Sequence, residues 1–252
     1  MNLIILTDKD RTDGGSYLLE DHRAEHIRSI LQLSEGDSIE IGILNAGQGR
    51  GRITTIDSKQ VCIRAEKLEK RDYSALSPHI DLICALPRPQ TLKKILLICG
   101  MMAVRKLYLI RASRVEKSYY HSPLLNPDNY NSFLIEGLSQ GKHTRLPSVE
   151  IHERFKPFFE EILPSIEKDE EHTVLRIFPD PESNRTIKAF YDGNARRILL
   201  AIGPEGGWVP FEIEMMQEHG FEKCTLGRWI LRVEHAVTAA LSQIEMIRLE
   251  KK

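Results

Sequence analysis

The sequence has few cysteines, and their placement excludes two classes of protein. Cys62, Cys84, Cys99 and Cys224 are scattered without the CxxC spacing of a zinc site. Most of them lie inside apolar runs, which is typical of reduced core residues in an intracellular protein. We therefore expect neither a disulfide framework nor a metal site.

The sequence also lacks a long apolar run and an excess of charge of either sign. No run approaches the length that spans a bilayer, and the chain does not begin with the charged and apolar regions of a secretion signal. We therefore expect a cytoplasmic protein without membrane contact. The net charge of -1 says little about partners, because a nucleic-acid enzyme needs only local clusters of Lys and Arg. The 252 residues suffice for one large or two modest domains.

A strand-loop-helix unit near the carboxyl end carries the most informative pattern that is present. Residues 198–202 form a nearly continuous apolar run, which is typical of a strand buried on both faces. The run ends at residues 203–207, GPEGG, whose glycines we do not expect to serve packing. A helix then begins at Pro210 and stops at Gly220.

A second unit of the same kind follows directly. Residues 221–226 form a short strand, Gly227 turns the chain, and helical spacing resumes at Val233. In open α/β sheets, ligands bind outside the carboxyl ends of parallel strands, which is where both glycine loops fall. The pair of loops therefore favours a binding site, although each loop alone is equally compatible with a tight turn.

The two loops carry a recognisable signature. GPEGG is neither GxxxxGK[ST] nor GxGxxG, so a nucleotide P-loop and a dinucleotide fingerprint are unsupported. Residues 202–207, IGPEGG, together with residues 226–236, LGRWILRVEHA, resemble the signature of the RsmE family, the ribosomal RNA uridine-N3 methyltransferases of the SPOUT class. That family has GPEGG before an aromatic residue and then LG-x-x-ILR-x-E-T-A, so His235 stands where Thr is usual.

The resemblance implies an α/β fold of two domains. A C-terminal SPOUT domain with a trefoil-knotted, mostly parallel sheet would follow a small N-terminal PUA-like β-barrel that helps to hold RNA. Short strands over residues 3–6, 38–44, 51–56 and 60–66 and a helix over 21–30 agree with a small barrel. We place the domains at residues 1–73 and 74–252, with the boundary near Ala75.

The middle of the chain alternates strands and helices, which predicts a parallel sheet. Strands are expected over residues 80–86, 106–110 and 173–178, and helices from residue 92, over 130–138 and over 153–165. Residues 85–88, ALPR, resemble the family's ALPK, and residues 101–104, MMAV, stand where the family commonly has ELGV.

The resemblance further implies S-adenosylmethionine as the cofactor, held by three loops that the knot brings together. No metal is needed, because the sulfonium is already an activated methyl donor. Backbone groups and apolar side chains of the loops would hold the cofactor. These residues are Leu175, Phe178, Pro179, Ile202, Gly203, Pro204, Glu205, Gly206, Gly207, Leu226, Gly227, Arg228, Ile230 and Leu231.

The chemistry of the reaction selects the catalytic candidates. Uracil N3 carries a proton and is a poor nucleophile until that proton leaves, so catalysis needs a base or a group that stabilises the anion. We expect Arg232 to bind the anion and Glu234 or Glu205 to accept the proton. Arg145, in a stretch that resembles the family's E-Q-x-x-R-x-x-x-P, is expected to contact the target nucleotide. The structural alternatives are a salt bridge between Arg232 and Glu234 and a helix cap by Arg145.

Basic residues outside the loops are candidates for RNA contact, because charge neutralisation dominates RNA affinity. These candidates are Arg11, Arg23, His26, Arg28, Arg88, Arg114 and Arg145. Residues 45–52, NAGQGRGR, are expected to form a basic glycine-rich loop or hairpin tip. The alternative for each of these charges is simple solvation on an exposed face.

The sequence therefore predicts a homodimeric enzyme that methylates uridine N3 in small-subunit ribosomal RNA. The dimer face would be the apolar side of the last helix, at Val237, Leu241, Ile244 and Ile247. Two departures, His235 and a chain start MNLIIL in place of the family's basic-aromatic cluster, keep alternatives open. A divergent paralog could methylate another RNA or base, and a non-catalytic RNA-binding or ribosome-assembly protein could keep the fold.

Overall fold

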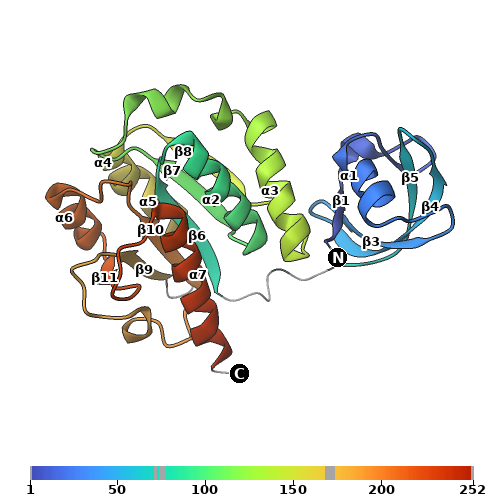
Figure 1. Cartoon of the computed structure of the whole chain (residues 1–252). Helices are drawn as coiled ribbons and strands as arrows, with labels where there is room; N and C mark the ends of the chain where they lie inside the picture. Colours follow the sequence, from blue (N-terminus) through green and yellow to red (C-terminus); the bar gives the residue numbers. More distant parts are fainter. Residues whose placement is uncertain (1, 71–72, 74–77, 168–173, 251–252) are drawn as a thin grey trace.

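The first of two sheets is built from residues near the amino terminus. The computed structural model describes residues 2–70, 73, 78–167 and 174–250 (Figure 1). The strand order of the first sheet is β1-β3-β4-β5-β2. Its elements are β1 (Ile4–Leu6), β2 (Tyr17–Leu19), α1 (His22–Glu25) with a π-helical turn (His26–Ile30), β3 (Ser38–Ile43), β4 (Gly47–Ile56) and β5 (Val61–Glu69), together with a 3-10 turn (Asp8–Asp10). The helix begins where predicted because the Asp21 side chain accepts the backbone N–H of Arg23 at 2.9 Å.

This sheet is a curled half-barrel, so the expected barrel is not closed. β1 runs parallel to β3, the remaining neighbours are antiparallel, and β1 and β2 are the two edges. The strand β2 was not expected from the sequence, because three residues are too few to show alternation. Its inward side chains, Tyr17 and Leu19, complete the small core that Ile27 of the π-helical turn covers.

The glycine-rich stretch 45–52 begins as the tip of the β3–β4 hairpin and is otherwise strand, so the hairpin alternative is confirmed and a loop over the whole stretch is wrong. Only Asn45 and Ala46 turn the chain before β4 begins at Gly47. A Cβ atom on Gly49 would overlap the carbonyl oxygen of Lys67, and one on Gly51 would lie 2.6 Å from the Ile63 side chain. The glycines therefore let β4 and β5 approach closely where their register shifts.

The second sheet is entirely parallel and has the order β11-β9-β10-β6-β7-β8. Its strands are β6 (His79–Ala85), β7 (Lys106–Ile110), β8 (Ser148–His152), β9 (Val174–Pro179), β10 (Arg197–Ile202) and β11 (Glu222–Cys224). Its helices are α2 (Pro89–Met101), α3 (Pro127–Gly141), α4 (Phe155–Pro157), a π-helical turn (Phe158–Ile162), α5 (Leu163–Glu167), α6 (Pro210–Glu218) and α7 (Val233–Leu249), with 3-10 turns at Lys117–His121, Pro123–Leu125 and Ile187–Ala189.

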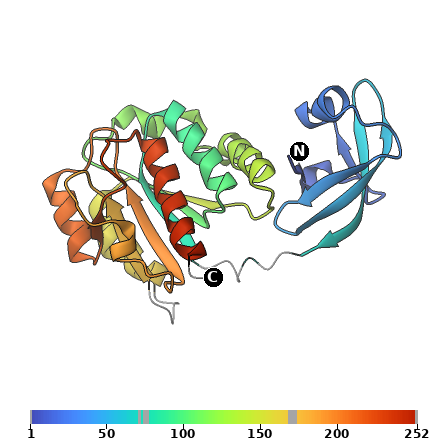
Figure 2. The ribbon, with the colours of Figure 1, turned by 60° about the horizontal axis from the view of Figure 1, so that its bottom comes forward.

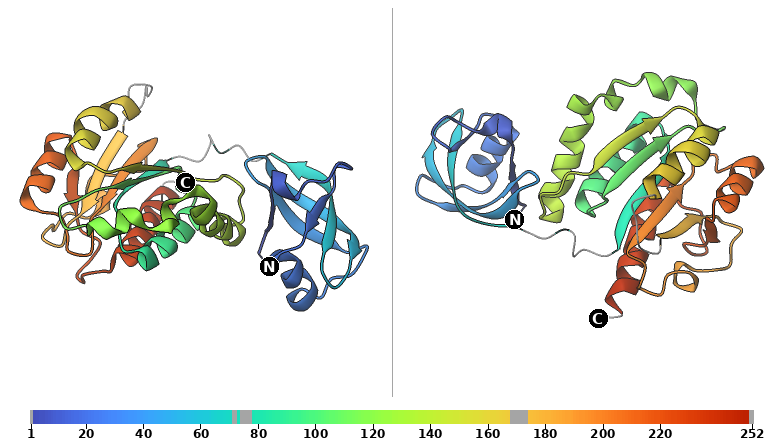
Figure 3. Two further views of the ribbon diagram at one scale, coloured as in Figure 1. Left: turned by 90° about the horizontal axis from the view of Figure 1, so that it is seen from above. Right: turned by 180° about the vertical axis from the view of Figure 1, so that it is seen from behind.

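Helices cover both faces of the parallel sheet. α2, α3 and α7 lie on one face, and the helical segment from α4 to α5 lies on the other (Figures 1 and 3). α6 packs with that segment, because the Phe159 ring contacts both His219 and Phe221 after the end of α6. Within the described ranges, no helix combines the length and the apolarity needed to span a membrane. The α/β architecture with a mostly parallel sheet is confirmed.

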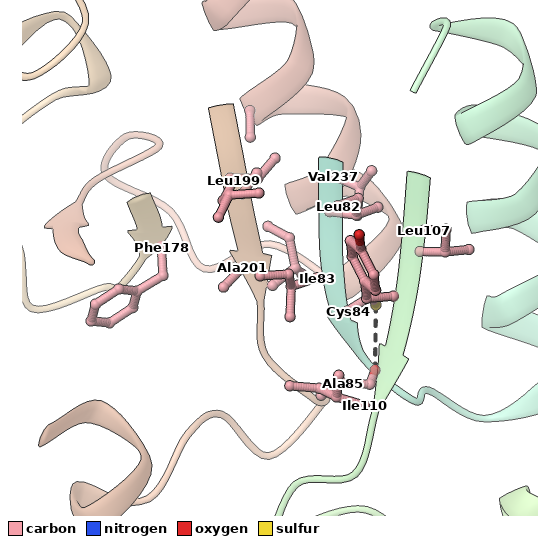
Figure 4. Close-up of a cluster of buried hydrophobic side chains, with 14 of the residues drawn as sticks. Leu82, Ile83, Cys84, Ala85, Leu107, Ile110, Phe178, Leu199, Ala201 and Val237 are labelled. Atoms are coloured by element: carbon pink, nitrogen blue, oxygen red, sulfur yellow. Dashed lines mark hydrogen bonds between the residues drawn. The ribbon is translucent and has the colours of Figure 1, made fainter. Parts of the chain in front are cut away.

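The apolar side of α7 belongs to the core of the same chain, so the expected dimer face is wrong. Val237, Leu241, Ile244 and Ile247 are at most 8% exposed. Figure 4 shows Val237 beside Leu82 of β6. The helical spacing identified a buried stripe correctly, but spacing does not say whether the same chain or a second copy buries it.

The buried cysteines behave as the sequence predicts for core residues. All four thiols are free, and Cys84, Cys99 and Cys224 are buried. Burial raises the pKa of the Cys224 thiol to about 12, and burial also raises the pKa of Cys84 and Cys99. These thiols are therefore protonated packing groups at neutral pH.

The amino-terminal edge of the parallel sheet is held by a buried charged cluster. Asp81 in β6 is fully buried and binds Arg105 before β7, with donor-acceptor distances of 2.8 and 2.7 Å. The same carboxylate accepts the Nε of Arg197 at the start of β10, at 2.9 Å. One carboxylate thus ties together three neighbouring strands.

The two sheets meet at the carboxyl end of α3 (Figure 2). The backbone N–H of Leu3 donates to the Ser139 carbonyl at 3.0 Å, and the Ser139 hydroxyl donates to the Leu3 carbonyl at 2.6 Å. The Asn45 N–H donates to the Thr144 carbonyl at 2.7 Å, and the Asn45 side chain accepts the Leu146 N–H at 2.8 Å. The segment around Arg145 is therefore part of the junction. The expected boundary near Ala75 lies outside the described residues.

Candidate functional site

Three loops leave the same edge of the parallel sheet side by side. β9 lies between β10 and β11, and all three strands run in the same direction. Neighbouring strands are about 5 Å apart, so the chain segments that follow Pro179, Ile202 and Cys224 start within about 10 Å of each other. The two glycine loops therefore lie near each other at the carboxyl ends of these strands, and the binding site that the sequence predicts there stays a prediction.

The GPEGG loop is shaped by a turn and by a tryptophan. The Gly207 N–H donates to the Pro204 carbonyl at 2.8 Å, and Gly207 has a φ of +74°, which favours glycine. A Cβ atom on Gly203 would lie only 3.1 Å from the Trp208 Nε1. Gly203 therefore also serves packing, contrary to our expectation for this loop.

The loop between β11 and α7 presents unusually exposed apolar side chains. Trp229 is 76% exposed and Ile230 is 85% exposed. Gly227 has a φ of +134°, and the preceding Leu226 carbonyl accepts the Gln243 side-chain N–H at 3.0 Å. The turn is thus anchored to α7 at Leu226, while Arg228, Trp229, Ile230 and Leu231 extend into solvent.

The loop after β9 offers fewer of the predicted cofactor contacts than the sequence suggests. Leu175 pairs with Ile198 and precedes the strand end at Pro179 by four residues, or about 13 Å along the strand. Phe178 is fully buried in the main core (Figure 4). Of the apolar residues predicted on this strand, only Pro179 lies at the loop and is partly exposed.

Glu234 and Arg232 occupy different environments at the start of α7. Glu234 is 6% exposed and accepts a hydrogen bond from the Lys94 ammonium of α2 at 2.9 Å. That hydrogen bond holds the pKa of the Glu234 carboxyl below its ordinary value of 4.5, against the opposing effect of burial. Arg232 is the exposed N-cap residue of α7. The partner of Glu234 is therefore Lys94, not the neighbouring Arg232.

Glu205, Arg88 and Arg114 lie together around the GPEGG loop. The Glu205 carboxylate is 41% exposed and lies 3.9 Å from the Arg88 Nε. The Arg114 guanidinium, which follows β7, donates to the Gly206 carbonyl. Two of the predicted RNA contacts are therefore at the same edge as the predicted cofactor loops.

The remaining basic candidates lie elsewhere. Arg145 precedes β8, so it lies at the amino-terminal ends of the parallel strands, away from the loops, and at the domain junction. Arg23 is 16% exposed and binds Asp10 at 2.6 Å and Asp21 at 2.7 Å. Burial lowers the pKa of Arg23, but the hydrogen bonds to these two carboxylates outweigh it and raise the pKa overall. Arg23 is thus committed to the fold of the half-barrel.

Arg11, His26 and Arg28 also lie on the half-barrel, away from the loops. Arg11 is exposed, His26 is half-buried, and Arg28 binds Glu25 at 2.6 Å. The structure therefore does not bring the predicted RNA contacts into one cluster. It divides them between the carboxyl-terminal edge of the parallel sheet, the domain junction and the half-barrel.

Sequence reasoning missed two side chains at this edge. Lys94 has no signal in the sequence, because its partner Glu234 is far away along the chain. Glu212, near the start of α6, is 1% exposed and accepts two backbone N–H groups, which the local sequence does not indicate. Among the described residues, no group of three or more His, Cys, Asp or Glu side chains could hold a metal ion.

Comparison with known proteins identifies the family. Residues 75–245 match the family of the RNA methyltransferase domain. The chain is 29% identical over 245 residues to the ribosomal RNA small subunit methyltransferase E of Treponema pallidum, covering 97% of this chain and 90% of that protein. It is 26% identical over 240 residues to methyltransferase E 1 of Borreliella burgdorferi, covering 95% of both chains. This chain belongs to the RsmE family of RNA methyltransferases.

The fold agrees with this assignment. A crystal structure of a ribosomal RNA small subunit methyltransferase E from Neisseria gonorrhoeae, bound to S-adenosyl methionine, superposes with a TM-score of 0.71. The alignment covers 97% of this chain and 98% of that chain at 16% identity. Both domains of this RsmE protein therefore have counterparts in one solved relative.

Proposed function

We propose that this RsmE protein transfers a methyl group from S-adenosylmethionine to N3 of a uridine in small-subunit ribosomal RNA. The observation that carries the proposal is the pair of signature loops at one edge of the parallel sheet, in a chain that matches the family along nearly its whole length. The half-barrel, residues 1–73, would add affinity for RNA, and residues 74–252 would carry the reaction.

The residues at the loops fit S-adenosylmethionine, which has both polar and apolar parts. The Trp208 indole N–H is buried, packs against Gly203 and has no hydrogen-bond partner among the described residues, so it is a donor that a ligand could use. Ile230 and Leu231 offer exposed apolar surface. Backbone groups of Ile202, Gly203, Leu226 and Ile230 would hold the cofactor, with Leu231 and Pro179 at its apolar parts. When bound, S-adenosylmethionine supplies an activated methyl group on a sulfonium sulfur.

The exposed charges at the same edge suit the proton transfer. The N3 proton of uracil must leave, so a nearby base and a cation for the resulting anion are required. Glu205 is accessible and is the better base, because the pKa of Glu234 is lowered by Lys94 and its carboxylate is buried. Arg232 is exposed at the end of the third loop and would bind the anion. Arg145 would contact RNA at the domain junction.

We further propose that the protein acts as a homodimer. The expected face on α7 is buried, but Phe211, Trp229, Ile230 and Met246 are each more than half exposed, at 52%, 76%, 85% and 62%. Large exposed apolar side chains become buried where a second copy of the chain packs on them. Light scattering after gel filtration would measure the mass; a monomer at micromolar concentration would contradict this part of the proposal.

The function is tested by nucleoside mass spectrometry. Small-subunit particles and naked ribosomal RNA from cells lacking the protein are incubated with it and labelled S-adenosylmethionine. The proposal predicts 3-methyluridine that carries the label. A labelled nucleoside of another kind would identify a divergent paralog with a different target. Cofactor binding without any transfer, or no binding at all, would support an RNA-binding or ribosome-assembly role.

A further inference from the structure

Glu212 joins two loops that are distant in the sequence. Its Oε1 accepts the backbone N–H of Ser113 at 2.6 Å, and its Oε2 accepts the backbone N–H of Val209 at 3.0 Å. Ser113 follows β7 and Val209 ends the segment that begins with GPEGG after β10. β6 separates these two strands in the sheet, so the carboxylate bridges two loops across the end of β6.

The bridge is more than a helix cap. Glu212 is the third residue of α6, where an acid that accepts the N–H of the N-cap residue is common. That role needs one oxygen, and the second oxygen reaches a residue 99 positions away in the chain. The carboxylate is 1% exposed, and each of its two oxygens accepts one backbone N–H.

A second bond joins the same loops. The Arg114 guanidinium, next to Ser113, donates to the carbonyl of Gly206. Val209 follows Trp208, whose ring lies against Gly203. Glu212 therefore fixes the residue that follows this tryptophan, and with Arg114 it makes the loop after β7 and the GPEGG loop one unit.

We propose that Glu212 is a positioning residue: it holds the GPEGG loop in the conformation that binds S-adenosylmethionine by tying it to Ser113. The inference rests on the assignment of these loops to the cofactor, and it does not depend on which RNA or base is methylated. Its failure can thus be told apart from failure of the proposed target, because cofactor binding and loop exchange are measured without RNA.

Glu212→Gln is the decisive variant. The glutamine amide keeps the shape of the glutamate side chain and one acceptor oxygen. Its NH2 group, however, faces one of the two backbone N–H groups, which then has no acceptor. We expect the dissociation constant of S-adenosylmethionine, measured by calorimetry, to rise about tenfold, as for the loss of a charged hydrogen bond. Hydrogen exchange should accelerate in residues 111–117 and 205–210, while exchange in β3 to β5 stays unchanged.

Two controls separate positioning from general destabilisation. Glu214→Gln makes the same chemical change at an exposed position of the same helix and should alter neither quantity. Met216→Ala removes a fully buried side chain from α6 and should lower the melting temperature without changing cofactor affinity.

The proposal is overturned if Glu212→Gln binds S-adenosylmethionine as tightly as the unmodified chain. It is also overturned if Met216→Ala, with the same loss of melting temperature as Glu212→Gln, weakens S-adenosylmethionine binding as much as Glu212→Gln does. Should Glu212→Gln not fold, Arg114→Met removes the second bridge from an exposed position and should raise the dissociation constant about threefold, in line with a weaker, solvent-exposed bond. Wild-type affinity and exchange in that variant would equally contradict the proposal.

Discussion

At the amino-terminal edge of the parallel sheet, Asp81 and Arg197 are buried and paired, whereas at the carboxyl-terminal edge Glu205, Arg232 and Ile230 are exposed. Asp81 is 0% exposed and Arg197 is 2% exposed at the first edge. Glu205 is 41% exposed and Ile230 is 85% exposed at the second. The first arrangement stabilises three strands, and the second leaves groups available to a ligand. We therefore expect substitutions of the buried pair to lower stability, and substitutions of the exposed groups to lower binding or methyl transfer.

The largest loss of stability is expected at Asp81. Asp81→Ala removes the buried carboxylate that Arg105 and Arg197 share, so the free energy of unfolding should fall by about 3 to 5 kcal/mol. Urea unfolding followed by circular dichroism measures this change. Asp13→Ala, at an exposed position, is the control and should change stability by less than about 0.5 kcal/mol. A loss below about 1 kcal/mol for Asp81→Ala would show that the cluster does not hold the edge.

At Arg232 we expect a loss of methyl transfer without a loss of stability. Arg232→Ala removes an exposed cation, so stability and cofactor affinity should be kept while methyl transfer falls by about a hundredfold or more. Single-turnover transfer to ribosomal RNA, together with calorimetry, separates the two quantities. Turnover equal to that of the unmodified chain would remove Arg232 from the mechanism.

Lys94 tests whether Glu234 serves stability more than proton transfer. Because Lys94 lowers the pKa of Glu234 below 4.5, the pair stabilises the fold above that pH and the contribution is lost as pH falls through the lowered value. Lys94→Met should therefore cost about 1 kcal/mol at neutral pH, since the lysine is largely exposed. Unfolding measured across acidic pH should show the difference from the unmodified chain vanishing below the lowered pKa. A difference that grows on acidification would contradict this interpretation.

A small gain of stability is expected from a substitution at Ala103, near the amino-terminal edge of the parallel sheet. Ala103 has a φ of +55°, in the left-handed region, at the position where the RsmE signature commonly has glycine. Ala103→Gly should raise the free energy of unfolding by up to about 1 kcal/mol, because the strain of the Cβ atom is relieved. Thermal unfolding measures the change, with Ala239→Gly in α7 as a control that should destabilise. A loss of stability in Ala103→Gly would mean that this strain is negligible.

The smallest effect on cofactor binding is expected at Arg145. It precedes the five-residue strand β8, about 16 Å of strand away from the loop edge. Arg145→Ala should leave the dissociation constant of S-adenosylmethionine unchanged in calorimetry. A large loss of affinity would contradict the separation of the two edges.

Most strands of the parallel sheet could be predicted from the sequence because they are largely apolar runs, and the run before GPEGG ends at glycine and proline. Residues 106–110 were predicted with their observed bounds, and the run before GPEGG was placed within one residue. β8 was missed because it lies at the sheet edge and mixes polar with apolar residues. The glycines of β4 were interpreted as a loop because sequence alone does not show the close approach of β5.

The site was predictable in its loops but not in its connections. Glycine spacing located the two signature loops, since positive φ values at Gly207 and Gly227 are local properties. The bonds from Glu212 to Ser113 and from Lys94 to Glu234 join distant parts of the chain, and nothing in their local sequence announces them. The same reason explains why Arg145 was expected at the site and the buried stripe of α7 at a dimer face. The trefoil knot, which depends on threading and not on strand pairing, stays a prediction.

A crystal of this RsmE protein soaked in S-adenosylmethionine tests the central claim most directly. The account predicts the ligand between residues 203–207 and residues 226–231, next to Pro179, with the Glu212 bridge intact. Empty loops at saturating ligand, or a ligand bound at the opposite edge of the parallel sheet, would contradict it.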